Sequence, residues 1–181
     1  MEKKFTPSHL DIKAFAQGSG ELSGVSPLAD WSRLSQEQFA GLESSPVRWR
    51  LHGRTEPISG AGDETWLDLE AELGLPMQCQ RCLKPVLSEV FAERSFRFVS
   101  DEATAAALDD EAEEDILVLS RDFDALALVE DELLMALPLV PRHVVCPEEV
   151  TLSFSDPAVE AAQERPNPFA ALANLKKPPT S

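Results

Sequence analysis

The sequence feature that most constrains the fold is a regular alternation of apolar and acidic side chains in WLDLEAELGL, residues 66–75. A period of two places successive side chains on opposite faces of a strand, so this segment predicts a strand with one face in a core and one in water. Strands of this kind are typical of antiparallel sheets. The apolar face holds Leu67, Leu69, Ala71, Leu73 and Leu75, and the acidic face holds Asp68, Glu70 and Glu72.

Two neighbouring segments carry the same period. In VRWRLHGR, residues 47–54, apolar residues alternate with Arg48 and Arg50, and VLSEVFAERSFRFV, residues 86–99, resumes the alternation after a turn. Three such strands separated by turns predict an antiparallel meander. Its acidic face would meet Arg48 and Arg50 across the sheet or meet water.

A helix is predicted over residues 122–137, with Asp122 as its candidate N-cap and Pro138 at its end. Its apolar residues recur at spacings of three and four, which places them on one stripe. They are Leu126, Val129, Leu133 and Leu137. We therefore predict an α+β fold, an antiparallel sheet from about residue 47 to a short strand at 116–119, with this amphipathic helix packed on it and flexible or helical terminal extensions.

Three regions are predicted along the chain. Residues 1–45 form a helical or flexible N-terminal extension, in which Asp30 is a candidate N-cap for a helix in WSRLSQEQFAG. Residues 46–150 form the α+β core domain. Residues 151–181 form a proline-rich tail with a short helix candidate in NPFAALANLKK.

The net charge of -16, from 32 acidic and 16 basic residues, constrains the partners. A field of this sign repels nucleic acids and attracts basic proteins. Thirteen acids and a single base, Arg121, lie between Asp101 and Glu132. Within that stretch, DEATAAALDDEAEED, residues 101–115, has few large apolar side chains and is predicted to be a solvated acidic loop.

The segment QCQRCLKPV, residues 78–86, places Cys79 and Cys82 three positions apart in a chain with one further cysteine. A structural zinc ion needs four tetrahedral ligands, commonly from two short arms. The second arm available is HVVC, in which His143 and Cys146 have the matching spacing. These four residues are the candidate metal ligands.

Two other interpretations of the cysteine pair stay open. A redox pair commonly stands at a helix N-terminus, but Pro85 disfavours a helical backbone at Lys84. Alternatively, the pair is a tight connection between two strands, with the cysteines packed as small apolar residues. The odd number of cysteines and the absence of an export signal predict reduced thiols in a cytoplasmic protein.

No catalytic constellation is evident, so no enzyme activity is predicted. The three histidines lie in no arrangement typical of a triad, and GSGELSG, residues 18–24, lacks the lysine and the preceding strand of a phosphate-binding loop. Direct RNA binding by residues 48–97 is an alternative function, although the arginines of this region can instead pair with acids on the next strand. The residues for RNA binding would be Arg48, Arg50, Arg54, Arg81 and Lys84, with Trp49 as a stacking surface.

Three ordered blocks together closely resemble the YceD family of bacterial large ribosomal RNA subunit accumulation proteins. The blocks are CQRCLKPV, VEDELLMALPLVPRH and RPNPFAALANLKK. This resemblance implies a role in the synthesis, processing or stability of 23S ribosomal RNA, thus in ribosome biogenesis, with no enzymatic activity. Some relatives carry further cysteines after the helix, whereas this chain has only Cys146 with His143.

The resemblance and the charge together predict the partners. They are ribosomal proteins or large-subunit assembly factors, with ribosomal RNA contacted directly or indirectly. No membrane contact is predicted, because no run approaches the ~18 apolar residues of a membrane helix. The C-terminal block is predicted to be a recognition helix on a tether. Its candidate partner-binding residues are Pro166, Asn167, Pro168, Phe169, Leu172, Leu175 and Lys176.

Overall fold

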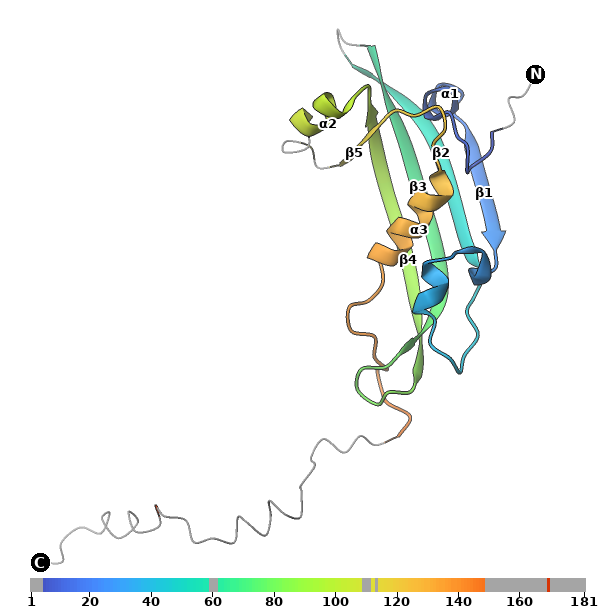
Figure 1. The fold of residues 1–181 in the computed structure, drawn as a ribbon, viewed down its shortest axis with the longest axis vertical. Coiled ribbons are helices and arrows are strands. Elements are labelled where there is room, and N and C mark those ends of the chain that lie inside the picture. The colour runs from blue at the N-terminus through green and yellow to red at the C-terminus, as the bar shows by residue number, and fades with distance from the viewer. Residues whose placement is uncertain (1–4, 59–61, 109–111, 113, 149–168, 170–181) are drawn as a thin grey trace, which may run out of the picture. The chain divides into compact units, whose positions relative to one another are not determined.

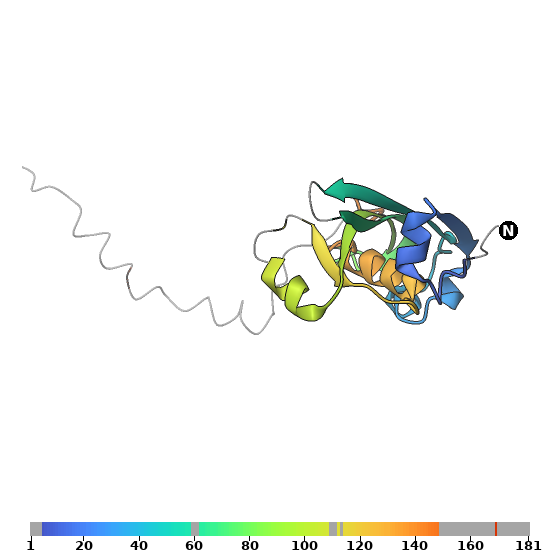
Figure 2. The same cartoon turned by 90° about the horizontal axis from the view of Figure 1, so that it is seen from above.

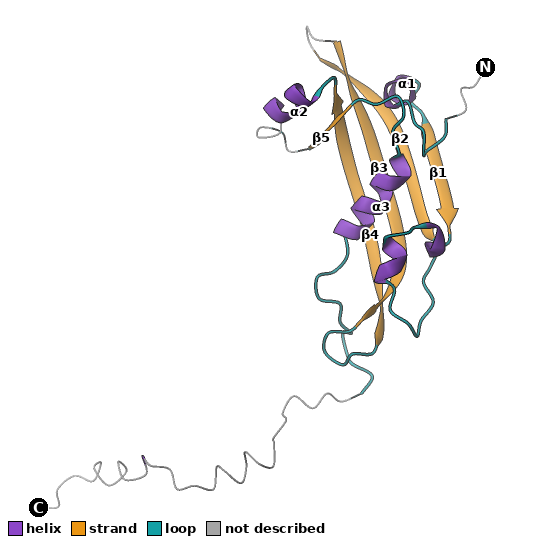
Figure 3. Cartoon of the chain, in the orientation of Figure 1, coloured by secondary structure: helices purple, strands orange, loops and turns teal. Residues whose placement is uncertain are grey.

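A five-stranded sheet is the framework of the computed structural model, which describes residues 5–58, 62–108, 112, 114–148 and 169 (Figure 1). The strands follow one another across the sheet in the order of the sequence. They are β1 (Glu21–Ser26), β2 (Val47–Ile58), β3 (Gly62–Gln78), β4 (Pro85–Val99) and β5 (Asp115–Val118). Figure 3 shows that the long strands β2, β3 and β4 dominate the sheet.

The pairing of β2, β3 and β4 is antiparallel and keeps the predicted alternation. Arg48 stands opposite Glu72, and Arg50 stands opposite Glu70. Each arginine Nη1 lies near the opposite carboxylate, at 3.5 and 3.8 Å respectively. Leu69, on the other face, is fully buried. The predicted meander and its contacts between arginines and acids are therefore confirmed.

The prediction of a purely antiparallel sheet is wrong at β5, which runs parallel to β4. A parallel neighbour needs a crossover of roughly a dozen residues, and the acidic stretch after β4 supplies that length. Part of this stretch forms α2 (Glu102–Leu108), so the predicted loop over 101–115 is also wrong there. Its alanines favour a helix, while residues 109–111 and 113 lie outside the described residues.

Two of the α-helices begin at aspartate caps. Asp11 accepts a hydrogen bond from the Ala14 N–H at the start of α1 (Ile12–Gln17), and Asp124 caps α3 (Ala125–Met135) in the same way. The predicted cap, Asp122, is therefore two residues too early. Its carboxylate instead lies 2.6 Å from Nδ1 of His9, which is possible because the chain before α1 runs beside the chain before α3.

The helix predicted after Asp30 is replaced by two short 3-10 helices, η1 (Leu28–Asp30) and η2 (Leu34–Glu37). Trp31 lies between them with an extended backbone at φ -108° and ψ 95°. Its side chain is buried, and its Nε1 donates to Ser26 Oγ at 2.9 Å. Burial of this indole outweighs the weak capping signal of Asp30, so the sequence pattern at this position gave a wrong helix.

The N-terminal 45 residues contribute β1 and a large share of the core. Leu10, Phe15 and Leu34 are fully buried and belong to the same apolar cluster as Val129 and Leu133 of α3. Figure 2 shows α1 and α3 on the same side of the sheet. The other side carries the ion-paired rows of β2 and β3, whose residues Arg48, Arg50, Glu70 and Glu72 are exposed.

The chain divides into a unit of residues 1–145 and a second unit of residues 146–181, of which 146–148 and 169 are described. The three-region division predicted from the sequence stays a prediction. Within the described parts of the chain, no helix has the length and apolar character needed to cross a membrane.

Candidate metal centre at the turn between β3 and β4

The cysteine pair forms the turn that joins β3 to β4. The Cys79 N–H donates to the Lys84 carbonyl at 2.9 Å, and the Leu83 N–H donates back to the Cys79 carbonyl at 2.8 Å. Leu83 has a positive φ of 60°, which is uncommon for a residue with a side chain. These contacts fold the chain tightly enough to bring Cys79 and Cys82 to one side of the turn.

The segment after α3 packs against this turn although it lies about sixty residues away in the sequence. The Gln80 N–H donates to the Pro141 carbonyl at 2.9 Å. The ring of His143 bridges the turn, because its Nε2 lies 3.1 Å from the Pro85 carbonyl and its Nδ1 lies 3.4 Å from Cys82 Sγ. The two predicted arms are therefore side by side.

The four predicted ligands converge. The ligand atoms of Cys79, Cys82, His143 and Cys146 all lie within 4.8 Å of one another. In a tetrahedral zinc site, with Zn–S near 2.3 Å and Zn–N near 2.0 Å, a sulfur and a nitrogen ligand are about 3.5 Å apart. The separation of 3.4 Å between Cys82 Sγ and His143 Nδ1 fits this geometry.

The protonation of His143 also fits a metal ligand. The Pro85 carbonyl can only accept a hydrogen bond, so Nε2 of His143 must carry the proton and donate it. The lone pair of Nδ1 is then directed at the cysteines. A backbone acceptor on the second ring nitrogen is the usual means of orienting a histidine ligand.

The electrostatics of the turn favour a thiolate at Cys79. Burial raises the pKa of its thiol, but backbone N–H groups of Cys82, His143 and Arg81 oppose this effect, and the pKa falls to about 5. Thiolates are the form in which cysteines bind metal. The residues present therefore fit a Cys3His zinc site in donor set, spacing and charge.

The redox interpretation finds less support in this geometry. None of the three cysteines forms a disulfide, and Cys79 is fully buried. The chain after Cys82 continues through a left-handed residue, Leu83, into β4 rather than into a helix. The helix N-terminus that commonly activates a redox cysteine is therefore missing from this turn.

The residues named for RNA binding are distributed over different surfaces. Arg48 and Arg50 lie on the open face of the sheet in the ion pairs already described, and Arg54 Nε donates to Asp68 at 2.8 Å. Trp49 points to the opposite face, where its ring covers Gly24 so closely that a Cβ there would lie 2.5 Å from it. Trp49 and the two arginines adjoin one pocket, but the Trp49 ring is partly buried against the core and is not an open stacking surface beside them.

The candidate partner-binding residues of the tail lie outside the described residues, apart from Phe169, which is exposed. Sequence reasoning missed the contacts that join the two metal arms, because Gln80 and the Pro85 carbonyl carry no chemical signature. The sequence VPRHVVC did contain a signal. Its apolar residues follow helix-ending prolines and match neither a helical nor a strand period.

Comparisons with known proteins agree with the resemblance. Residues 67–176 match the family model described as Large ribosomal RNA subunit accumulation protein YceD. The chain is also similar to a Haemophilus influenzae protein of the same name, with 34% identity over 110 residues. That match covers 60% of this chain and 63% of the relative, so it spans less than two thirds of the relative's length. No solved structure matches the chain.

Proposed function

We propose that this chain, which belongs to the YceD family of large ribosomal RNA subunit accumulation proteins, is a non-catalytic factor that promotes the synthesis, processing or stability of 23S ribosomal RNA. The family match carries this proposal, because it includes the cysteine turn, α3 and most of the C-terminal block. We place its action in ribosome biogenesis and assign the recognition step to basic protein partners.

The acidic surface around α2 supports a basic partner. Asp101, Glu102 and Asp115 are exposed, and four more carboxylates lie between them in the sequence within 109–113. The acids of α3, by contrast, are held in ion pairs with arginines. A concentrated negative surface accelerates and orients the approach of proteins rich in lysine and arginine.

Complementation in cells that lack the gene tests this proposal. The wild-type chain should restore the ratio of 23S to 16S ribosomal RNA, measured by gel electrophoresis of total RNA. A variant with the acids of 109–113 neutralised should restore it poorly. It should also bind purified large-subunit ribosomal proteins more weakly at low salt. The four changes are Asp109→Asn, Asp110→Asn, Glu111→Gln and Glu113→Gln.

A matched control neutralises four exposed acids elsewhere on the chain, so that the net charge changes equally. These changes are Glu21→Gln, Glu37→Gln, Glu43→Gln and Glu89→Gln. The control should behave like the wild type. If both variants restore 23S ribosomal RNA and bind the ribosomal proteins equally well, the acidic surface is not the partner site.

We further propose that the Cys3His group holds one structural zinc ion, which would tie the segment after α3 to the turn. The fit of the donor set and the orientation of His143 support this. Elemental analysis of the purified protein should give about one zinc per chain. Cys82→Ser should lose it, whereas Ser88→Ala, a change on β4 outside the ligand set, should keep it. A zinc-free wild type would reject the site.

The C-terminal block around Phe169 remains our candidate for a second partner contact. Its prolines and its short apolar pattern are typical of a recognition segment. Deletion of residues 156–181 should reduce the recovery of ribosomal proteins in a pull-down. Equal recovery with the full and the shortened chain would remove this role.

Direct RNA binding by residues 48–97 is the alternative. The ion pairs of Arg48, Arg50 and Arg54 weaken it, because binding RNA would require these pairs to open. A filter-binding salt series with 23S ribosomal RNA fragments separates the two functions. Measurable affinity at low salt that falls when Arg48 and Arg50 become glutamine would favour RNA as the direct ligand.

A further inference from the structure

Exposed apolar side chains gather at the end of the sheet that carries the cysteine turn. Seven of the twelve large apolar side chains that are exposed among the described residues lie on the turn, at the start of β4 or between the end of α3 and residue 145. Soluble proteins rarely leave such residues clustered unless they bind a partner. They are Leu83, Leu87, Met135, Leu139, Val140, Val144 and Val145.

A groove lies beside this cluster, with a volume of about 580 Å³. It runs between η2, the end of β3 and the segment that follows α3. Its lining is mostly aliphatic, with glutamine amides at the margins and Glu37 as its one charged residue. The apolar lining includes Phe39, Met77, Leu134, Met135, Leu137 and Leu139.

Two arginines directly follow residues that line the groove. Gln80 and Pro141 line it, they are joined by a hydrogen bond, and they precede Arg81 and Arg142 in the chain. Both arginines are exposed, and neither has an ion pair within the described residues. Most other arginines of the described chain are paired with acids, namely Arg33, Arg48, Arg50, Arg54, Arg94 and Arg97.

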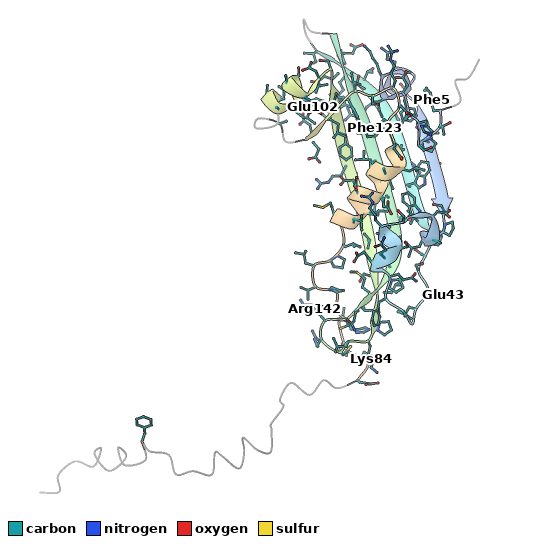
Figure 4. All side chains as sticks on the ribbon, viewed as in Figure 1. Phe5, Glu43, Lys84, Glu102, Phe123 and Arg142 are labelled. Carbon is teal, nitrogen blue, oxygen red and sulfur yellow. The ribbon has the colours of Figure 1, made fainter. Side chains whose placement is uncertain are left out.

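The charge at this end differs from that of the acidic surface. Figure 4 places Lys84 and Arg142, together with Glu43, toward one end of the sheet and Glu102 at the opposite end. A ligand that is attracted to Arg81 and Arg142 is of opposite charge to the basic partners assigned to α2. Arg81 and Arg142 have no ion pair among the described residues, and guanidinium groups bind carboxylates in a bidentate manner.

The backbone conformation and the exposure of Leu83 indicate a role in binding rather than in the stability of the turn. It has a φ of 60°, which glycine adopts without strain, and its side chain is 62% exposed. Holding a leucine in this conformation costs about 1 kcal/mol or more. The turn thus presents an apolar side chain at a position where its own folding would be served better by glycine.

We propose that this groove is the docking site for an amphipathic protein segment, which places apolar side chains in the groove and carboxylates against Arg81 and Arg142. A protein segment fits better than RNA, because the groove lining is mostly aliphatic and, among the described residues, only two arginines without an ion pair adjoin it. Single-stranded RNA sites use a track of cations with exposed aromatic platforms. The inference goes beyond the proposed function and does not depend on the acidic surface.

The contacts between the cysteine turn and the segment after α3 hold the docking groove in place. The segment that supplies Leu139, Val140, Val144 and Val145 is attached to the turn through Gln80 and His143. If these contacts were lost, the segment after α3, which forms one side of the groove, would no longer be held beside the turn. Docking should therefore weaken when the turn is disturbed, even though the sheet and its core stay folded.

Selection from a phage library of random peptides about 12 residues long, roughly three helical turns, tests the proposal with the full-length protein. Enriched peptides should combine leucine, isoleucine, methionine or phenylalanine with aspartate or glutamate. A synthetic copy of one such peptide, carrying a fluorophore, then allows polarisation titrations. Failure to enrich any such peptide would overturn the proposal.

Variants locate the binding. Leu139→Glu should weaken the peptide at least about tenfold, as expected at a central apolar contact. Arg142→Glu should lower the affinity for the peptide severalfold, because an attraction becomes a repulsion. This loss of affinity should be larger at low salt, where charges are screened less. Val25→Glu, which makes the same kind of change at an exposed apolar position on β1, should bind as the wild type does. Equal affinity for Leu139→Glu and Val25→Glu would overturn the assignment.

Leu83→Gly separates binding from folding. It relieves the backbone strain, so its urea midpoint should not fall, yet its affinity for the peptide should decrease. Unchanged affinity would remove Leu83 from the docking surface and contradict the proposal at the turn.

Two other occupants are outcomes that reject the proposal. If Arg142→Glu abolishes binding of 23S ribosomal RNA fragments while the peptide is unaffected, the groove end is an RNA site. If the wild type dimerises in light scattering and Leu139→Glu makes it monomeric, a second copy of the chain covers the groove.

Discussion

Glu130 of α3 is the buried carboxylate whose removal should most clearly destabilise the protein. It is 7% exposed, and its Oε1 accepts the backbone N–H groups of Arg33 and Leu34 at 2.8 and 3.0 Å. Its Oε2 accepts from Arg33 Nε at 3.0 Å. The Glu130 side chain thus attaches η2 and the residue before it to α3 through three hydrogen bonds.

The expected cost follows from these contacts. Glu130→Ala leaves one buried and one partly buried backbone donor without an acceptor, at about 1 to 3 kcal/mol each. The guanidinium of Arg33 is 47% exposed, so water compensates much of the loss of its ion pair. We expect a loss of about 3 kcal/mol in the free energy of unfolding. Glu130→Gln keeps one acceptor oxygen for the N–H groups and should cost about 1 to 2 kcal/mol.

Urea unfolding at pH 7, followed by circular dichroism, measures these changes. Glu132→Gln is the matched control, since it makes the same change two residues later. Burial raises the pKa of Glu132 above its ordinary value, and its partner Arg94 is more than half exposed. Neutralising Glu132 should therefore leave stability unchanged or increase it slightly. Equal destabilisation by Glu130→Gln and Glu132→Gln would refute the argument.

The pH dependence gives an independent test. Burial raises the pKa of Glu130, but hydrogen bonds from the Leu34 and Arg33 N–H groups and the Arg33 guanidinium outweigh it, so the pKa lies below its ordinary 4.5. The unfolded state then binds the proton more tightly, and the stabilisation is complete above pH 4.5 and lost as the pH falls through the folded-state pKa. The difference between the wild type and Glu130→Gln should shrink below pH 4.5. A constant difference down to pH 3 would contradict the assigned cause.

Further expected outcomes concern the core and the turn. Gly53→Ala should cost about 1 to 3 kcal/mol in urea unfolding, because its Cβ would lie 2.6 Å from the Phe15 ring and 3.0 Å from the backbone of α1; an unchanged midpoint would mean that α1 shifts freely. Trp31→Phe should cost about 1 kcal/mol, since the hydrogen bond to Ser26 is lost while most of the ring remains, and Ser26→Ala should show no further loss in the Trp31→Phe background. A zinc chelator should raise the rate of hydrogen exchange in residues 138–145 but leave the far-ultraviolet circular dichroism unchanged. Global unfolding by the chelator would instead show that the stability of the whole domain depends on the site.

The sequence predicted the parts of the fold that depend on local periodicity. The alternation around Leu69 determines which face of β3 is buried, and this face is the same in any arrangement of the neighbouring strands. The direction of β5 could not be predicted in this way. It depends on the path of the chain through α2, and four residues of strand carry no information about parallel or antiparallel pairing.

The position of the N-terminal region also depends on distant contacts. Phe15 packs against Gly53, and Arg33 binds Glu130 almost a hundred residues later. An isolated glycine in a strand and an isolated glutamate on a helix are both common, so neither indicates its partner. The four candidate metal ligands are different, because cysteine and histidine residues at matching spacings indicate metal binding. Their convergence was therefore predictable, while the hydrogen bonds that orient them were not.

The position of the cysteine turn explains why the segment after α3 takes part both in the proposed metal site and in the docking groove. The apolar core lies between the sheet and the helices and is closed by β1 to β4, α1 and α3. The chain beyond Pro138 has exposed side chains at Leu139, Val144 and Val145, so it gains little from burial. Its order rests on a few polar contacts, chiefly those of Pro141 and His143. A metal at the turn would add the energy that burial does not supply, and the groove wall would then persist without being buried in the core.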